Sequence, residues 1–126
     1  MVLADGCFDP LHVGHLAYLK EAMSRGARGP LIVNISSDEA IRAKGREPFQ
    51  VRVDRATTIL ALEMVDGVRL QSLPDAIRDL KPEILAKGME WNGHLPDEVL
   101  QACQETGTRI IYTTIRLLGS TERLRA

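Results

Sequence analysis

Residues 6–15 have the sequence GCFDPLHVGH, and the interpretation of the whole chain depends on them. A short apolar run at residues 2–4 precedes them and predicts a buried strand. After Pro10 the pattern becomes helical as far as Arg25. The apolar positions on one face of this helix are Leu16, Leu19, Ala22 and Met23. The segment is therefore expected to join a first strand to the N-terminus of a first helix, where free backbone N–H groups favour phosphate binding.

Two histidines of this segment point to the same chemistry. His12 and His15 are three residues apart, so on a helical turn they face the same way and can donate hydrogen bonds to a phosphoryl group that gains charge. Gly6 permits a tight turn, and Gly14 leaves room for a ligand on the helix start. The alternative is one capping and one surface histidine. A zinc site with Cys7 would lack a fourth ligand, so we expect an apolar filler there and no protein-bound metal.

Strands and helices are predicted to alternate along the rest of the chain. Strands are expected at residues 31–35, 68–71, 83–86 and 108–113, and helices at 39–43, 51–65, 75–80 and from the loop at 87–95 up to Gly107. This order predicts an α/β fold, a Rossmann-like, doubly wound, five-stranded parallel sheet with helices on both faces. Ligands bind such sheets beyond the carboxyl ends of the strands, where we expect the polar segments 5–15, 36–48, 87–95 and 113–121.

Local signals refine these elements. Ser36, Ser37 and Asp38 are candidate N-caps for the short second helix, and Asp75 for the helix at 75–80. Ile59, Leu60 and Met64 are expected to face the core from the helix at 51–65. Ser120 is a candidate cap for a last helical turn.

Composition limits the function classes. A chain of 126 residues is expected to form a single domain over residues 1–126. Its 16 Lys and Arg against 17 Asp and Glu argue against a nucleic-acid or membrane-surface binder. No apolar run approaches the roughly 20 residues of a membrane span, and the N-terminus lacks the pattern of a signal peptide. Two cysteines without a CxxC pair fit a reducing compartment, so a cytoplasmic location is expected.

The segment GCFDPLHVGH resembles the GxFDxxHxGH signature of the cytidylyltransferase-like nucleotidyltransferases, in the strand–turn–helix context that the signature requires. The resemblance runs from Val2 to about Leu124, and it is closest to the ADP-heptose synthase adenylyltransferase domain and the glycerol-3-phosphate cytidylyltransferases. It implies transfer of a nucleotidyl group from ATP or CTP, with Mg²⁺, to a phosphorylated small-molecule acceptor. It also implies a homodimer.

The same resemblance implies the roles of individual residues. Residues 44–48 are similar to the KGxGRP-like loop of heptose-phosphate adenylyltransferases, 87–91 to a KGGDY or GDDW segment, and 119–121 to an ISTT motif that binds a triphosphate tail. The implied catalytic residues are His12, His15 and Lys44. The implied nucleotide-binding residues are Gly6, Cys7, Phe8, Gly14, Lys87, Gly88, Glu90, Trp91, Ser120 and Thr121. The implied acceptor-binding residues are Asp9, Lys44, Arg46 and Arg55.

Departures from the family pattern leave alternatives open. Glu90 replaces an Asp, Glu122 replaces a hydroxyl, and either Arg52, Arg55 or Arg116 is expected to reach the phosphates. Adenylyl transfer to a sugar 1-phosphate is the leading interpretation. The alternatives are a glycerol-3-phosphate-type cytidylyltransferase and a nucleotide-binding module without turnover. A nicotinamide-mononucleotide adenylyltransferase would usually be longer, and a flavodoxin-like domain is a weaker rival.

Overall fold

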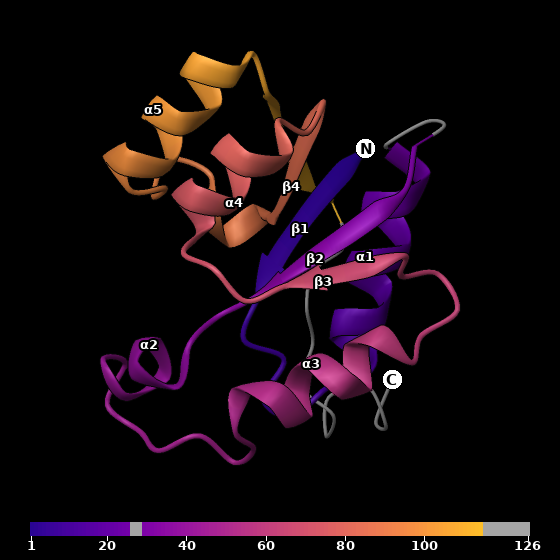
Figure 1. Ribbon diagram of the computed structural model, residues 1–126, viewed down its shortest axis with the longest axis vertical. Coiled ribbons are helices and arrows are strands. Elements are labelled where there is room, and N and C mark those ends of the chain that lie inside the picture. Colours follow the sequence, from indigo (N-terminus) through magenta and orange to yellow (C-terminus); the bar gives the residue numbers. More distant parts are fainter. Residues whose placement is uncertain (26–28, 115–126) are drawn as a thin grey trace.

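A computed structural model describes residues 1–25 and 29–114 of the chain. These residues build a five-stranded sheet with the order β3-β2-β1-β4-β5, in which every neighbouring pair is parallel (Figure 1). The strands are β1 Val2–Gly6, β2 Leu31–Ile35, β3 Gly67–Arg69, β4 Ile84–Gly88 and β5 Arg109–Thr113. The helices are α1 Val13–Arg25, α2 Asp38–Arg42, α3 Arg52–Leu60, α4 Leu73–Leu80 and α5 Asp97–Thr106, with a short 3₁₀ turn, η1, at Met89–Trp91.

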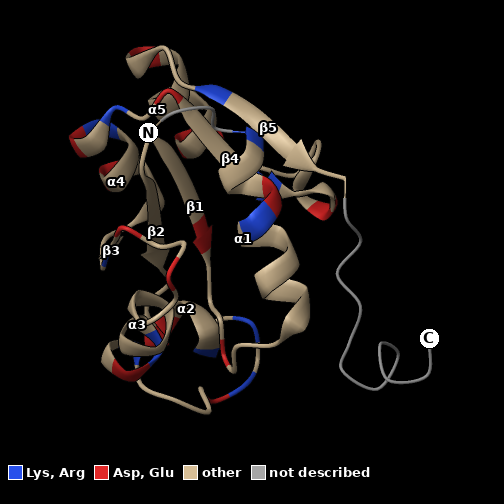
Figure 2. Ribbon diagram, turned by 90° about the vertical axis from the view of Figure 1, so that its right-hand side faces the viewer, with Lys and Arg blue, Asp and Glu red and all other residues tan. Residues whose placement is uncertain are grey.

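Helices cover both faces of the sheet, as the views in Figures 1 and 2 show. On one face, Leu19 of α1 and Ile59 of α3 join a buried cluster with Ala4 and Val33 of the central strands. On the other face, Ile77 of α4 and Val99 of α5 pack with Leu3 and Leu85. Because alternate residues of β1 supply the two clusters, its apolar run has no polar face. The predicted doubly wound α/β fold is confirmed.

The strand order reverses between β1 and β4. From β1 the sheet grows through β2 to β3 on one side, and through β4 to β5 on the other. The connections that leave the carboxyl ends of β1 and β4 therefore diverge, which opens a crevice at that edge. The penultimate residue of each strand at this edge is charged, Asp5 on β1 and Lys87 on β4.

Several local expectations need correction. Helix α3 ends at Leu60 rather than at residue 65, because Asp66 ties the chain to the start of β2: its N–H donates to Leu31 O at 2.9 Å, and its carboxylate accepts the Leu31 N–H at 2.9 Å. Leu60 is consequently 51% exposed instead of core-facing, whereas Met64 packs against the core from the turn that follows.

Three further differences concern helix faces and strand ends. Met23, expected on the buried face of α1, is 42% exposed. Ser72, not Asp75, caps α4, and its hydroxyl accepts the Asp75 N–H at 3.3 Å. Strand β4 continues through Lys87 and Gly88, which were expected in a loop, because both pair in register with β5. None of the helices within the described ranges combines the length and apolar character required to cross a bilayer.

Gly107 offers a test of the left-handed end of α5. Its φ is +70°, and a Cβ added there would meet nothing within 4 Å, so substitution costs backbone strain alone. We expect Gly107→Val to lower the free energy of unfolding in urea by about 1–2 kcal/mol more than Gly107→Asn, because Asn tolerates this conformation. Both variants lose glycine's freedom in the unfolded chain, so their difference reports the strain. Equal stabilities would contradict this assignment.

Candidate functional site

A pocket of about 570 Å³ occupies the crevice at the carboxyl ends of β1 and β4. One half is lined by the turn after β1 and by the loop after α2, with the polar side chains of His12, His15, Lys44 and Arg46. The other half is lined mainly by apolar residues before and within α4 and α5, with Trp91 of η1: Leu73, Pro74, Leu95, Pro96 and Val99. The pocket thus joins a cationic, hydrogen-bonding half to an apolar half.

The two histidines stack on each other at the start of α1. Their ring centroids are 3.7 Å apart, and the planes make an angle of 25°. The Nδ1 atom of His12 accepts the N–H of Gly14 at 3.0 Å, and that of His15 accepts the N–H of His12 at 3.1 Å. Since an Nδ1 that accepts cannot carry the proton of a neutral imidazole, the proton is on Nε2. Each neutral ring therefore has an Nε2–H donor to offer to a ligand in the pocket.

His15 is held in its neutral form. Burial, with a smaller contribution from the nearby His12 ring, lowers the pKa of His15 from 6.5 to about 4. The edge of its ring also meets Phe8 at a centroid distance of 5.1 Å. At neutral pH, His15 is therefore suited to donating a hydrogen bond rather than to accepting a proton.

Phe8 fixes the turn beneath the histidines. It is 2% exposed and has a φ of +52°, which turns its ring back under the carboxyl end of β1. A Cβ at Gly6 would lie 3.0 Å from Cζ of that ring, so any larger residue would have to displace the Phe8 ring. Gly6, Cys7 and Phe8 line the pocket, whereas Gly14 instead supplies the backbone N–H that orients His12.

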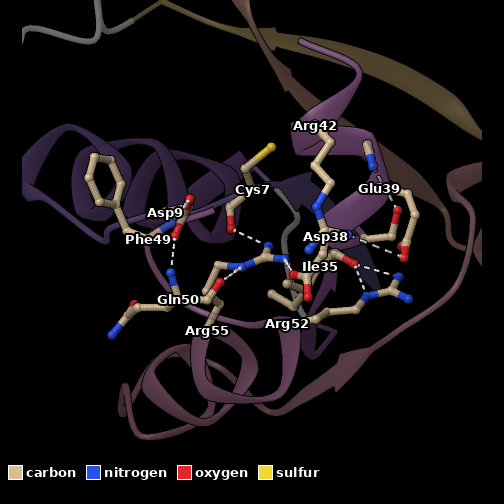
Figure 3. Close-up of polar contacts among 12 residues, drawn as sticks. Cys7, Asp9, Ile35, Asp38, Glu39, Arg42, Phe49, Gln50, Arg52 and Arg55 are labelled. Carbon is tan, nitrogen blue, oxygen red and sulfur yellow. Dashed lines mark hydrogen bonds and ion pairs between the residues drawn. The ribbon is translucent and has the colours of Figure 1, made fainter. Parts of the chain in front are cut away.

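Asp9 clamps the loop that carries Lys44 and Arg46. Its carboxylate is fully buried and accepts a hydrogen bond from Nη1 of Arg46 at 2.7 Å. It also accepts the backbone N–H groups of Phe49 and Gln50, each at 2.9 Å (Figure 3). Burial alone would raise the pKa of Asp9, but these hydrogen bonds outweigh it and lower the pKa. With its acceptors occupied, Asp9 is placed to orient this loop rather than to bind substrate directly.

The two basic residues of this loop, Lys44 and Arg46, differ in the groups that their side chains contact. Lys44 is exposed, and its ammonium donates to Sγ of Cys7 at 3.3 Å across the pocket wall. Arg46 is also exposed at the pocket, although its guanidinium is shared with Asp9 and lies 5.4 Å from the Phe49 ring centroid. The Cys7 thiol is therefore half-exposed at the site and not a buried filler.

Arg52 and Arg55 do not reach the pocket. Arg55 is completely buried and donates to Gln50 O, Cys7 O and the Asp38 carboxylate, the last at 2.7 Å (Figure 3). Arg52 donates to the carbonyl of Ile35 from two nitrogens, at 2.9 and 2.6 Å. Neither side chain lines the pocket, so the expected phosphate contact from this helix is not supported, and both arginines instead brace the backbone beside the site.

The β4 side of the crevice carries the remaining predicted residues. Lys87 is 4% exposed, and its ammonium pairs with the Asp5 carboxylate at 3.0 Å. Gly88 and Glu90 line the pocket, and the Glu90 carboxylate folds over Gly88, since a Cβ there would lie 2.4 Å from its oxygens. Trp91 closes the pocket from η1. Ser120, Thr121, Glu122 and Arg116 lie outside the described residues.

Residues that the sequence interpretation missed complete the edge of the sheet. Asp5 and Asn34 are polar residues within apolar strands, and that interruption was the available signal. The Asn34 amide donates to Asp5 Oδ1 and to Gln71 O, each at 3.0 Å. Tyr18 gave no such signal, because it belongs to an ordinary helix pattern. It is buried, its hydroxyl donates to Ala86 O and accepts the Asp5 N–H, and burial raises its pKa.

Comparison with known proteins places this geometry among nucleotidyltransferases. Residues 3–123 match the cytidylyltransferase-like family. The bifunctional protein HldE of Campylobacter fetus is 41% identical over 98 residues, which are 74% of this chain and 21% of HldE. The FAD synthase of Thermococcus onnurineus is 42% identical over 92 residues, 69% of this chain and 60% of that protein. This chain thus spans only about a fifth of the length of HldE.

A solved structure agrees over nearly the whole chain. The lipopolysaccharide core biosynthesis protein from Thermoplasma volcanium superimposes with a TM-score of 0.74 at 28% identity, covering 94% of this chain and 97% of its own.

The histidine geometry predicts an unusual titration. We expect the His15 imidazole to titrate at about 4 by NMR, and His12→Asn to raise that value only in part, because burial is the larger cause. Asn is the suitable replacement since its side-chain oxygen can still accept the Gly14 N–H. Because the unfolded chain binds this proton near 6.5, His15 makes the fold less stable as pH falls from 6.5 towards 4. A His15 pKa near 6.5 would refute the assignment of a neutral His15 at low pH.

Proposed function

Because the chain belongs to the cytidylyltransferase-like family, we propose that it transfers a nucleoside monophosphate from ATP or CTP to a phosphorylated small molecule and releases pyrophosphate. The observation that carries the proposal is the stacked pair His12 and His15, whose Nδ1 atoms are both occupied by backbone donors. Two preorganised Nε2–H donors at a helix N-terminus suit a triphosphate that gains charge during reaction.

The proposed reaction needs no protein nucleophile. An oxygen of the acceptor phosphate attacks the α-phosphorus, and a new P–O bond forms while the bond to the bridging oxygen of the β-phosphate breaks. The electron pair leaves with pyrophosphate, to which Mg²⁺ is bound, the ion entering with the triphosphate as part of the substrate. His12 and His15 would stabilise the α- and β-phosphates, and Lys44 would hold the acceptor or α-phosphate. Catalysis is then positioning and charge stabilisation.

Adenylyl transfer to a sugar 1-phosphate is the leading proposal for the acceptor. It is supported by the match to HldE and by the resemblance of the Lys44–Gly45–Arg46 loop to that of heptose-phosphate adenylyltransferases. Lys44 and Arg46 both line the pocket, and in this arrangement the ammonium and the guanidinium would bind the acceptor phosphate.

FMN is a second candidate acceptor. The FAD synthase match covers a larger share of its relative, 60%, than the HldE match does, at 21%. The apolar half of the pocket, with Leu73, Leu95 and Val99, offers a surface on which a flat ring system can be buried. This surface is the reason to test FMN as an acceptor beside the sugar 1-phosphate.

A pyrophosphate-release assay tests the proposal. Four nucleoside triphosphates are each combined with Mg²⁺ and a sugar 1-phosphate, glycerol 3-phosphate, nicotinamide mononucleotide or FMN. We expect release with ATP or CTP and one acceptor class only, and loss of that release with EDTA. Calorimetric titration of ATP and CTP runs in parallel. Tight nucleotide binding without release from any combination would instead support a binding module.

Replacement of His15 tests the role of the imidazole pair. We expect His15→Ala to lower turnover by about 10²- to 10³-fold, the effect of losing one preorganised donor. His94→Ala is the matched control, because His94 is exposed and does not line the pocket. Near-normal turnover in His15→Ala would remove His15 from the proposed mechanism.

A further inference from the structure

Lys87 is a lysine whose charge is already neutralised inside the fold. It lies at the end of β4 with its side chain 5% exposed, and Asp5 Oδ2 accepts its ammonium at 3.0 Å. The other oxygen of Asp5 accepts the amide of Asn34 at 3.0 Å, so the carboxylate is held in place from both sides. An anion in the pocket therefore meets a neutralised ion pair at Lys87, whereas at Lys44 it meets an exposed ammonium.

The same ammonium also contacts an aromatic ring. Nζ of Lys87 lies 4.5 Å from the ring centroid of Trp91, within the range of a cation–π contact. Trp91 belongs to η1, a single 3₁₀ turn in which it is half-buried, and it lines the apolar half of the pocket. A short turn restrains an indole ring weakly by itself, so a fixed cation against the ring restricts its rotation.

We propose that Lys87 is a positioning residue, which Asp5 clamps at the floor of the crevice so that its ammonium holds the Trp91 ring as a platform for the nucleotide base. This inference rests on the proposed function, because it takes a nucleotide as the ligand. Stacking a base on an aromatic side chain tightens binding roughly 5- to 100-fold. A platform already held in place avoids the entropic cost of ordering it during binding.

The position of the pair within the sheet supports this role. Asp5 and Lys87 lie at the ends of the adjacent central strands β1 and β4, which are the two strands that flank the crevice. Each of the two residues still pairs with the outer neighbour of its strand, Asp5 with Asn34 of β2 and Lys87 with Tyr112 of β5, although β1 and β4 no longer pair with each other at this level. The cation is thus anchored to the sheet, and it links a residue of η1 outside the sheet to that anchor.

Substitution of Lys87 separates a positioning role from a phosphate contact. Trp91 is the chain's only tryptophan, so its fluorescence and its quenching by acrylamide report this ring alone in the free protein. We expect Lys87→Met to increase acrylamide quenching and to weaken binding of ATP or CTP roughly 5- to 50-fold, with kcat changed less than about threefold. Lys87→Arg should restore both properties, because a guanidinium also packs on aromatic rings. Lys20→Met, on the exposed face of α1, is the control.

Inorganic tripolyphosphate serves as a matched ligand without a ring. We expect its affinity to be the same in wild type and Lys87→Met. Weaker tripolyphosphate binding in Lys87→Met would overturn the proposal and make Lys87 a phosphate ligand. Unchanged Trp91 quenching would also overturn it.

If Lys87→Met leaves Asp5 unpaired and does not fold, the double variant Asp5→Asn/Lys87→Met removes both charges, and the same results are expected. Quenching and binding need no turnover, so absence of activity in the wild type would count against the proposed function alone.

Discussion

The satisfaction of strand carbonyls at the carboxyl edge of the sheet is the constraint on which the site depends. Where β1 and β4 diverge, carbonyl groups lose their ladder partners, and a buried carbonyl without a donor is costly. Side chains supply the donors. At the divergence itself, Tyr18 of α1 bonds Ala86 O of β4; beside it, Arg52 of α3 bonds Ile35 O of β2, and Arg55 of α3 bonds Cys7 O in the turn after β1. Helices α1 and α3 thus satisfy carbonyl groups at the edge of the sheet that borders the crevice.

The charged residues around the site fall into two groups according to whether they are buried or exposed. Arg55, Asp9 and Lys87 are buried and paired within the protein, so their charges shape the backbone and the neighbouring loops. Lys44 remains exposed at the pocket beside the two imidazoles, and Arg46 is exposed there as well, although Asp9 binds one of its guanidinium nitrogens. A buried unpaired cation would be expensive, whereas an exposed one can await an anionic ligand. Burial therefore distinguishes the residues that build the site from those available to substrate.

Local patterns in the sequence predicted the fold and the histidine turn well. The apolar run at Leu31–Ile35 and the strand–turn–helix at residues 6–15 depend on neighbours in the chain, which a sequence displays directly. The role of Arg55 depends on Cys7 and Asp38, 48 and 17 positions away, and no local pattern carries that information. The end of α3 was missed for a similar reason, since Asp66 binds the distant residue Leu31. Tertiary partners, not propensity, decided both.

The division of the pocket also explains why overall identity is a weak guide to the acceptor. HldE and FAD synthase, two proteins with different names and activities, match this chain at 41% and 42% identity. Under the proposed function, the turn at residues 6–15 serves the phosphate chemistry, which is the same for every phosphorylated acceptor. Discrimination requires surfaces that contact the rest of the acceptor, and those available here are the loop that Asp9 clamps and the apolar wall near α4 and α5. Residues of these two surfaces, rather than the histidine motif, are therefore the ones that determine acceptor choice under the proposed function.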